Sequence, residues 1–260
     1  MKKSDFFIGW SDRVPKASAK AIRLLLIPLF VLIPLLVFVL IHFEKPFTDH
    51  QFELGQVREF SGVYLDNPKP MLVLDEGYYP DDYNPNALLV GYGKFGAEST
   101  ISEAEQIWGD LSNKKVQLRG TLLYGDGRVI IELTEGANSV IDVSKSTQGV
   151  FANSFVGEHK SEYEGEIIDP KCWFGAMKPG EGKVHKSCAI RCISGGIPPV
   201  LRIKQNEKYV YFILESVGDE NINVSVLEFV GELVTVQGLT YIQNGWNVLK
   251  TSATQINYKN

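Results

Sequence analysis

Residues 116–127, VQLRGTLLYGDG, have a counterpart near the end of the chain in residues 234–245, VTVQGLTYIQNG. In both stretches apolar residues alternate with polar ones up to a glycine, and a second apolar run then ends at Asp-Gly or Asn-Gly. Alternation with a period of two is typical of β-strands, and these dipeptides favour tight hairpin turns. The two stretches therefore predict two copies of one β-hairpin.

Two further pairs of segments extend this repeat. Residues 60–66 align with 163–169 around a shared glycine, and residues 70–74 align with 199–203. In chain order the three pairs lie 103, 129 and 118 residues apart, so the second copy is 26 residues longer between its first two segments. The first copy is longer after that point, where residues 99–111 have the pattern of a capped helix.

Three strands, a helix and a closing hairpin follow one another in the order of an OB-like five-stranded barrel. The shorter equivalent of the helix in the second copy lies near residues 224–229. We therefore predict a mainly β protein with two small OB-like β-barrel domains, at residues 50–145 and 160–258, the second with an insertion at 170–196. A pair of other small barrels or sandwiches is the alternative.

An uncharged run of 18 residues, 24–41, precedes the repeat. A helix of this length spans about 27 Å, which matches the hydrocarbon core of a bilayer. We predict a basic N-terminus at residues 1–23 and one transmembrane helix at 24–42 in contact with lipid. A signal peptide is the competing interpretation, but no small-residue cleavage site follows the run.

The charges differ on the two sides of this helix. Basic residues precede it, namely Lys2, Lys3, Arg13, Lys16, Lys20 and Arg23. Acidic residues dominate after it, with Glu44, Asp49 and Glu53 beside the single Lys45. The positive-inside rule then predicts a cytoplasmic N-terminus. We expect a single-pass protein of the bacterial inner (cytoplasmic) membrane, with its C-terminal domains in the periplasm.

The net charge of −5 argues against a nucleic-acid partner. Binding to single strands needs a basic groove with stacking aromatic side chains. Here the aromatic cluster of Tyr78, Tyr79 and Tyr83 lies among acidic residues. The OB-like fold alone does not determine function, and the acidic surroundings and the expected location outside the cytoplasm lead us to predict no nucleic-acid binding.

All three cysteines and one of the four histidines lie in the insertion, as Cys172, His185, Cys188 and Cys192. Glycines and prolines indicate a loop in its first half, and residues 184–194 favour a helix that stops at Gly-Gly. On that helix His185, Cys188 and Cys192 lie within about 60° of one another. Cys188 and Cys192 are separated by about 6 Å of helix rise, whereas His185 and Cys192 are separated by about 10.5 Å.

Soft thiolate ligands suit Zn(II) or Cu(I), and an iron–sulfur centre is a less favoured alternative. We predict a metal site at Cys172, His185, Cys188 and Cys192, in which Cys188 and Cys192 share an ion most easily. Cys172 must fold back from the loop to join them, and His185 is the least certain ligand. Covalent c-type haem is excluded because the chain has no C-x-x-C-H.

Two other hypotheses remain for the same residues. A disulfide from Cys172 to Cys188 or Cys192 would staple the insertion, contribute about 3 kcal/mol and leave one thiol over. Cys188 could instead act as a nucleophile with His185 as its base, although no orienting carboxylate or oxyanion pattern is identifiable. We assign no catalytic residue. His42, His50 and His159 are expected at the membrane interface or the surface.

Residues 185–199, HKSCAIRCISGGIPP, preceded by the pattern G-x-I-x-D-x-x-C at 165–172, resemble a motif of poorly characterised bacterial secreted or membrane-anchored proteins. The resemblance implies that the four Cys and His residues form one site in a β-rich domain, and it implies no established reaction. We expect a non-enzymatic metal-binding or redox accessory module of an envelope complex, with an envelope protein as partner. A disulfide-stapled interaction scaffold is the alternative, and a Cys-dependent enzyme is a minor one.

Overall fold

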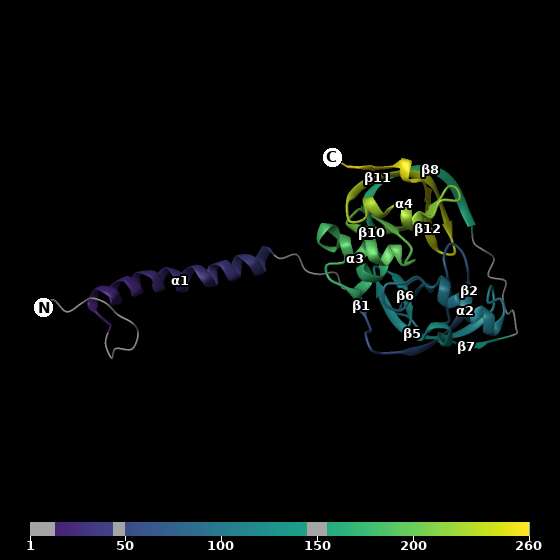
Figure 1. Cartoon of the computed structure of the whole chain (residues 1–260), viewed down its shortest axis with the longest axis horizontal. Coiled ribbons are helices and arrows are strands. Elements are labelled where there is room, and N and C mark those ends of the chain that lie inside the picture. Colours follow the sequence, from purple (N-terminus) through teal and green to yellow (C-terminus); the bar gives the residue numbers. More distant parts are fainter. Residues whose placement is uncertain (1–13, 44–49, 145–154, 260) are drawn as a thin grey trace. The chain divides into compact units, whose positions relative to one another are not determined.

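The structure, a computed structural model, describes residues 14–43, 50–144 and 155–259 (Figure 1). The chain divides into two units, Met1–Phe47 and Thr48–Asn260. The first contains α1 (Lys16–Phe43), which continues through Pro28 and Pro34. Its segment Ser18–Phe43 is long and apolar enough to cross a membrane, and its residues from Lys20 onward are exposed. An apolar N-terminal helix is therefore present where the sequence predicts one.

The first half of the second unit forms a closed β-barrel. Its strands are β1 (Gln51–Phe52), β2 (Arg58–Leu65), β3 (Met71–Leu74), β4 (Asn86–Gly91), β5 (Lys115–Gly125), β6 (Arg128–Leu133) and β7 (Val140–Val143). The ring runs β2-β3-β4-β6-β5 and closes through β5 onto β2. The β4–β6 pair is parallel and the other pairs of the ring are antiparallel. This is the closure of an OB-like barrel.

The second half repeats that arrangement. Its strands are β8 (Phe155–Ile168), β9 (Val200–Gln205), β10 (Lys208–Ser216), β11 (Leu233–Gln243), β12 (Trp246–Thr251) and β13 (Ile256–Tyr258). The ring runs β8-β9-β10-β12-β11 and closes onto β8, again with one parallel pair, β10–β12. The predicted pair of small OB-like barrels behind an apolar N-terminal helix is confirmed.

Matched glycines in the two barrels serve the same purpose. A Cβ atom on Gly62 would lie 2.2 Å from the carbonyl oxygen of Val73, and one on Gly165 would lie 2.3 Å from that of Arg202. Glycine therefore lets β2 approach the backbone of β3 in the first barrel and β8 approach that of β9 in the second. The repeat in the sequence therefore reflects a shared packing constraint rather than a shared composition.

The helical segments differ between the barrels as the spacing of the repeat predicts. In the first barrel α2 (Glu98–Trp108) links β4 to β5. In the second barrel only α4 (Ile222–Ser225) and the short turn η3 (Leu227–Phe229) occupy that place. The extra residues between β8 and β9 form η2 (Cys172–Ala176) and α3 (Gly182–Ser194).

The insertion lies where the two barrels meet (Figure 1). One buried apolar cluster combines Leu123 and Ile130 of the first barrel with Trp173, Phe174 and Ile213 of the second. The two barrels thus share a core across their contact, and the cysteine segment is part of it. Burial of Trp173 and Phe174 at this contact holds the cysteine segment in place between the barrels.

Candidate metal centre

Cys172 is positioned by a turn that directly follows β8. The Oδ1 atom of Asp169 accepts hydrogen bonds from the backbone N–H of Lys171 at 2.9 Å and of Cys172 at 3.4 Å. The carbonyl of Asp169 accepts a bond from the N–H of Trp173 at 3.0 Å. These bonds hold the start of the insertion in a helical turn and bury the Cys172 side chain.

The other three predicted residues lie on α3. Its first turn is fixed to the second barrel because Gly182 N–H donates to Glu166 Oε1 at 2.6 Å. His185 and Cys192 are buried, whereas Cys188 is half-buried. The helix therefore presents one ligand toward the solvent side of the site and two toward the interior.

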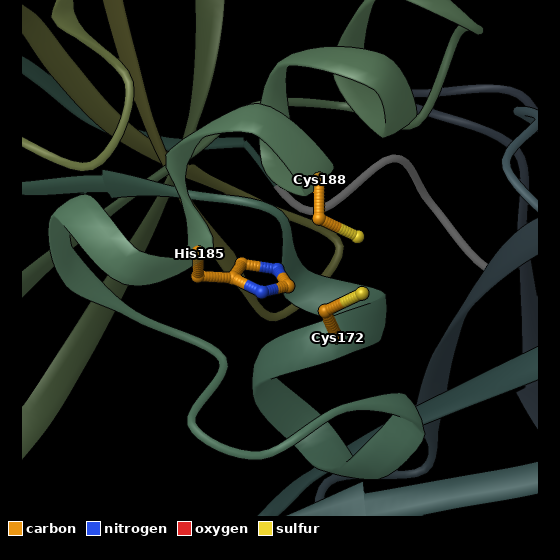
Figure 2. A group of neighbouring side chains, drawn as sticks. All are labelled: Cys172, His185 and Cys188. Atoms are coloured by element: carbon orange, nitrogen blue, oxygen red, sulfur yellow. The ribbon is translucent and has the colours of Figure 1, made fainter.

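The side chains of Cys172, His185 and Cys188 converge (Figure 2). Their possible ligand atoms all lie within 4.8 Å of one another. His185 Nε2 is buried and has no hydrogen-bond partner among the described residues. Two sulfurs and an imidazole with an unpartnered ring nitrogen thus lie close together.

Cys192 belongs to a second group of residues, which also contains Cys172. The ligand atoms of Asp169, Cys172 and Cys192 lie within 4.8 Å of one another, and all three residues are buried. Within the described ranges, no group of four meets this distance, and none joins Cys188 to Cys192. The structure thus brings His185, Cys188 and Cys192 close to Cys172, but His185 and Cys188 belong to one group and Cys192 belongs to the other.

This division differs from the expectation that Cys188 and Cys192 share an ion most easily. Cys192 is 1% exposed and points into the core shared by the barrels, while Cys188 is at the edge of the site. His185, expected to be the least certain ligand, is the residue that accompanies Cys172 and Cys188. The reason is the turn after β8, which brings Cys172 within 4.8 Å of both Cys188 and Cys192, so that Cys172 rather than a Cys188–Cys192 pair is common to the two groups.

Burial controls protonation in the metal-free site. The pKa of the Cys172 thiol is raised by its hydrogen bond with Cys192, by burial and by the nearby Asp169 carboxylate. Burial lowers the pKa of His185 below its usual range, against the attraction of Asp169. The imidazole is therefore neutral at physiological pH, which is the form that ligates metals.

Two lysines connect the site to the first barrel, and sequence reasoning missed both. Lys94 Nζ donates to Cys188 Sγ at 3.4 Å. Lys171 Nζ lies 2.5 Å from Glu132 Oε1 and also donates to the carbonyl oxygens of Gly91 and Gly93. No spacing in the sequence indicates Lys94, because it reaches the site only through the packing of the two barrels.

The sequence analysis expected His50 at the membrane interface or the surface, but the structure shows that His50 is buried. Its ring is hydrogen bonded to the carbonyl oxygen of Trp173 at 2.8 Å and to Asp126 Oδ2 at 3.0 Å. The prediction was wrong because β1 pairs with β5 and carries His50 under the insertion. His159 is exposed, as expected.

The donor set fits a thiophilic ion. Zinc bonds of about 2.3 Å to sulfur and 2.0 Å to nitrogen place the ligand atoms of a tetrahedral site about 3.5 to 4 Å apart. The separations in each observed group, all within 4.8 Å, are close to that spacing. The cluster can therefore hold a metal ion, with Asp169 as a carboxylate that the sequence analysis did not select.

Comparison with protein-family models, with curated proteins and with solved structures finds no match to this chain. The chemistry of the cluster is therefore inferred from its own residues.

Proposed function

We propose that this protein is a membrane-anchored, exported protein whose second barrel binds Zn(II) or Cu(I) through Cys172, His185, Cys188 and Cys192. In this proposal it is a non-enzymatic metal-binding or redox accessory module of a bacterial envelope complex. Thiolate ligands favour these soft or borderline ions over Mg²⁺ and Ca²⁺, which take oxygen ligands.

The observation that carries the proposal is His185, whose Nε2 is buried without a hydrogen-bond partner and which has a ring nitrogen within 4.8 Å of two cysteine sulfurs. A buried polar atom without a partner costs about 1–3 kcal/mol. A bound ion would remove that cost by giving the nitrogen a ligand bond. Burial of Cys172, Cys192 and His185 also suits retention of an ion better than attack on a substrate.

Export is supported by the charges around α1. Six basic residues precede the apolar run, and acidic residues dominate the segment that follows. The positive-inside rule then places both barrels outside the cytoplasm. A fusion of alkaline phosphatase to the C-terminus should be active in bacteria, whereas a cytoplasmic C-terminus would leave it inactive.

Metal binding is tested on the full chain, purified in detergent and stripped of metal under anaerobic, reducing conditions. Zn(II) and Cu(I) are titrated in competition with a chromophoric chelator. We expect stoichiometric binding, and at least about tenfold weaker binding in Cys188→Ser and His185→Ala. Ser187→Ala on the same helix and the exposed His159→Ala serve as controls. Three reactive thiols with no stoichiometric metal would refute the proposal.

A disulfide-stapled interaction scaffold is the second candidate. It is favoured by the position of Cys172, whose sulfur lies within 4.8 Å of the sulfurs of both Cys188 and Cys192. All three cysteines are free thiols in this structure. Mass spectrometry after alkylation of protein isolated from the envelope distinguishes the two candidates. One disulfide that persists, together with no bound metal, would favour the scaffold.

A further inference from the structure

Cys172 is the one residue common to both groups of metal-ligating side chains. His185 and Cys188 accompany it on the outer side, where Cys188 is half-buried. Asp169 and Cys192 accompany it on the inner side, where each of the three residues is buried. We call these the outer triad (Cys172, His185, Cys188) and the inner triad (Asp169, Cys172, Cys192).

The inner triad contains its own unpartnered ligand atom. Asp169 uses Oδ1 to accept the backbone N–H groups of Lys171 and Cys172. Its Oδ2 atom is buried and has no hydrogen bond of normal geometry among the described residues. A buried carboxylate oxygen in this state is costly unless a cation or a proton faces it. Each triad thus holds one buried polar atom without a hydrogen bond of normal geometry, and in the metal-free site the Cys172 thiol proton faces the Asp169 carboxylate.

The charges of the two triads match two divalent ions. A metal ion binds cysteine as the thiolate and histidine as the neutral imidazole, so the metal-bound site would carry four negative charges, from three thiolates and the Asp169 carboxylate. One Zn(II) neutralises half of that charge, and burial of the remainder is unfavourable. Lys171 is committed to Glu132 and to two backbone carbonyls, and Lys94, which is exposed, donates to the Cys188 sulfur. A second Zn(II) would balance the site.

We infer that Cys172 bridges two adjacent metal positions, one completed by His185 and Cys188 and the other by Asp169 and Cys192. This inference rests on the proposed function and specifies its ligand arrangement. A thiolate sulfur has more than one lone pair and can bind two ions at once. Each position then has three protein ligands, and a tetrahedral ion has one place left for water or for a group from a partner.

Stoichiometry tests the inference on the full chain in detergent, with Zn(II) as the probe. Metal-free, reduced protein is saturated with Zn(II), freed of excess ion and analysed for zinc per chain. We expect two Zn(II) in the wild type, one in Asp169→Asn, one in His185→Ala and none retained in Cys172→Ser. Asp142→Asn, an exposed carboxylate in β7, is the matched control and should keep two.

Two substitutions, Asp169→Asn and Cys192→Ala, each remove a different ligand of the inner triad, so the test does not depend on one variant folding. Asparagine at position 169 retains an oxygen that can accept the backbone bonds to Lys171 and Cys172, so the turn after β8 should persist. If Asp169→Asn nevertheless fails to fold, Cys192→Ala removes the inner triad by a different residue and should also bind one Zn(II). Two Zn(II) retained in Asp169→Asn or in Cys192→Ala would overturn the inner position.

The wild type distinguishes failure of the inference from failure of the proposed function. One Zn(II) per chain would overturn the bridged pair and leave metal binding intact, whereas no Zn(II) would overturn both. Co(II) provides a direct test of the bridge. A shared thiolate couples two Co(II) ions magnetically, so the second equivalent should reduce the electron paramagnetic resonance intensity per cobalt. Strictly additive intensity would show two independent sites and overturn the role of Cys172.

Discussion

Lys171 Nζ of the second barrel lies 2.5 Å from Glu132 Oε1 of the first, and both side chains are buried. Lys171 directly precedes Cys172, so this ion pair fixes the start of the insertion against the first barrel. The same ammonium group donates to the carbonyls of Gly91 and Gly93. The position of the candidate metal ligand thus depends on an acidic residue from the other barrel.

Glu132→Ala should destabilise the protein by about 3–5 kcal/mol, because it leaves the Lys171 ammonium buried without its counter-charge. The free energy of unfolding of the metal-free protein, measured in urea, checks this value. Asp75→Ala removes an exposed ion pair with Lys115 and should cost no more than about 1 kcal/mol. Equal effects of the two substitutions would contradict the role given to the buried pair.

Asp126 predicts a pH dependence of stability. Burial alone raises the pKa of this carboxyl, but hydrogen bonds from His50 and Tyr211 outweigh burial and hold the pKa below its ordinary value of 3.8. A carboxyl with a lowered native pKa stabilises the fold above its unfolded pKa. That contribution is lost as the pH falls through the native pKa.

The difference in unfolding free energy between wild type and Asp126→Asn should therefore be constant above about pH 5 and shrink at lower pH. Urea unfolding at a series of pH values measures it. Asp142→Asn, whose carboxylate is exposed, should show no comparable trend. A wild-type advantage that stays unchanged down to the lowest pH would contradict the assignment.

Gly195 should tolerate no side chain. A Cβ atom there would lie 2.0 Å from the carbonyl oxygen of Lys94, and the carbonyl of Gly195 accepts the N–H of Gly96 at 3.0 Å. Gly195→Ala should cost about 1–3 kcal/mol by forcing the end of α3 away from the first barrel. Gly218→Ala has open space around the new methyl group and should change stability by less than about 0.5 kcal/mol.

Bound Zn(II) should stabilise the fold through the insertion. Free Zn(II) at about 100 times its dissociation constant adds about 2.7 kcal/mol to the unfolding free energy. Cys188→Ser should remove the part of that gain that comes from the outer position while leaving the first barrel folded, as judged by the amide resonances of core residues such as Ile131. Loss of those resonances in the variant would show that the two barrels unfold together.

Much of the fold is predictable because the constraints are local. Alternating strands, hairpin dipeptides and the paired Gly62 and Gly165 each act within one or two strands, so their pattern is visible in the sequence. The 26-residue difference in spacing located the insertion, and Gly195-Gly196 marked the end of its helix correctly.

The site itself was only partly predictable. The cysteines and His185 stand out by residue type, but their division into two triads depends on how the turn at Asp169 meets α3. Asp169 was visible three residues before Cys172 in a strand-end position, which is a signal that could have been used. His50, Lys94 and Glu132 belong to the other barrel, and no local pattern links them to the insertion.

Lys94, Glu132 and His50 all contact the insertion from the first barrel, either at its cysteines or beside them. The first barrel has no cysteine of its own, yet it supplies the wall against which Cys172 and Cys188 are held. A graft of residues 169–196 onto an unrelated OB-like barrel would therefore transfer the ligands without the contacts from the first barrel that position them. Both barrels together are therefore the smallest unit that could be transferred with the site intact. The second barrel provides the metal ligands, and the first barrel provides the surface that holds them in position.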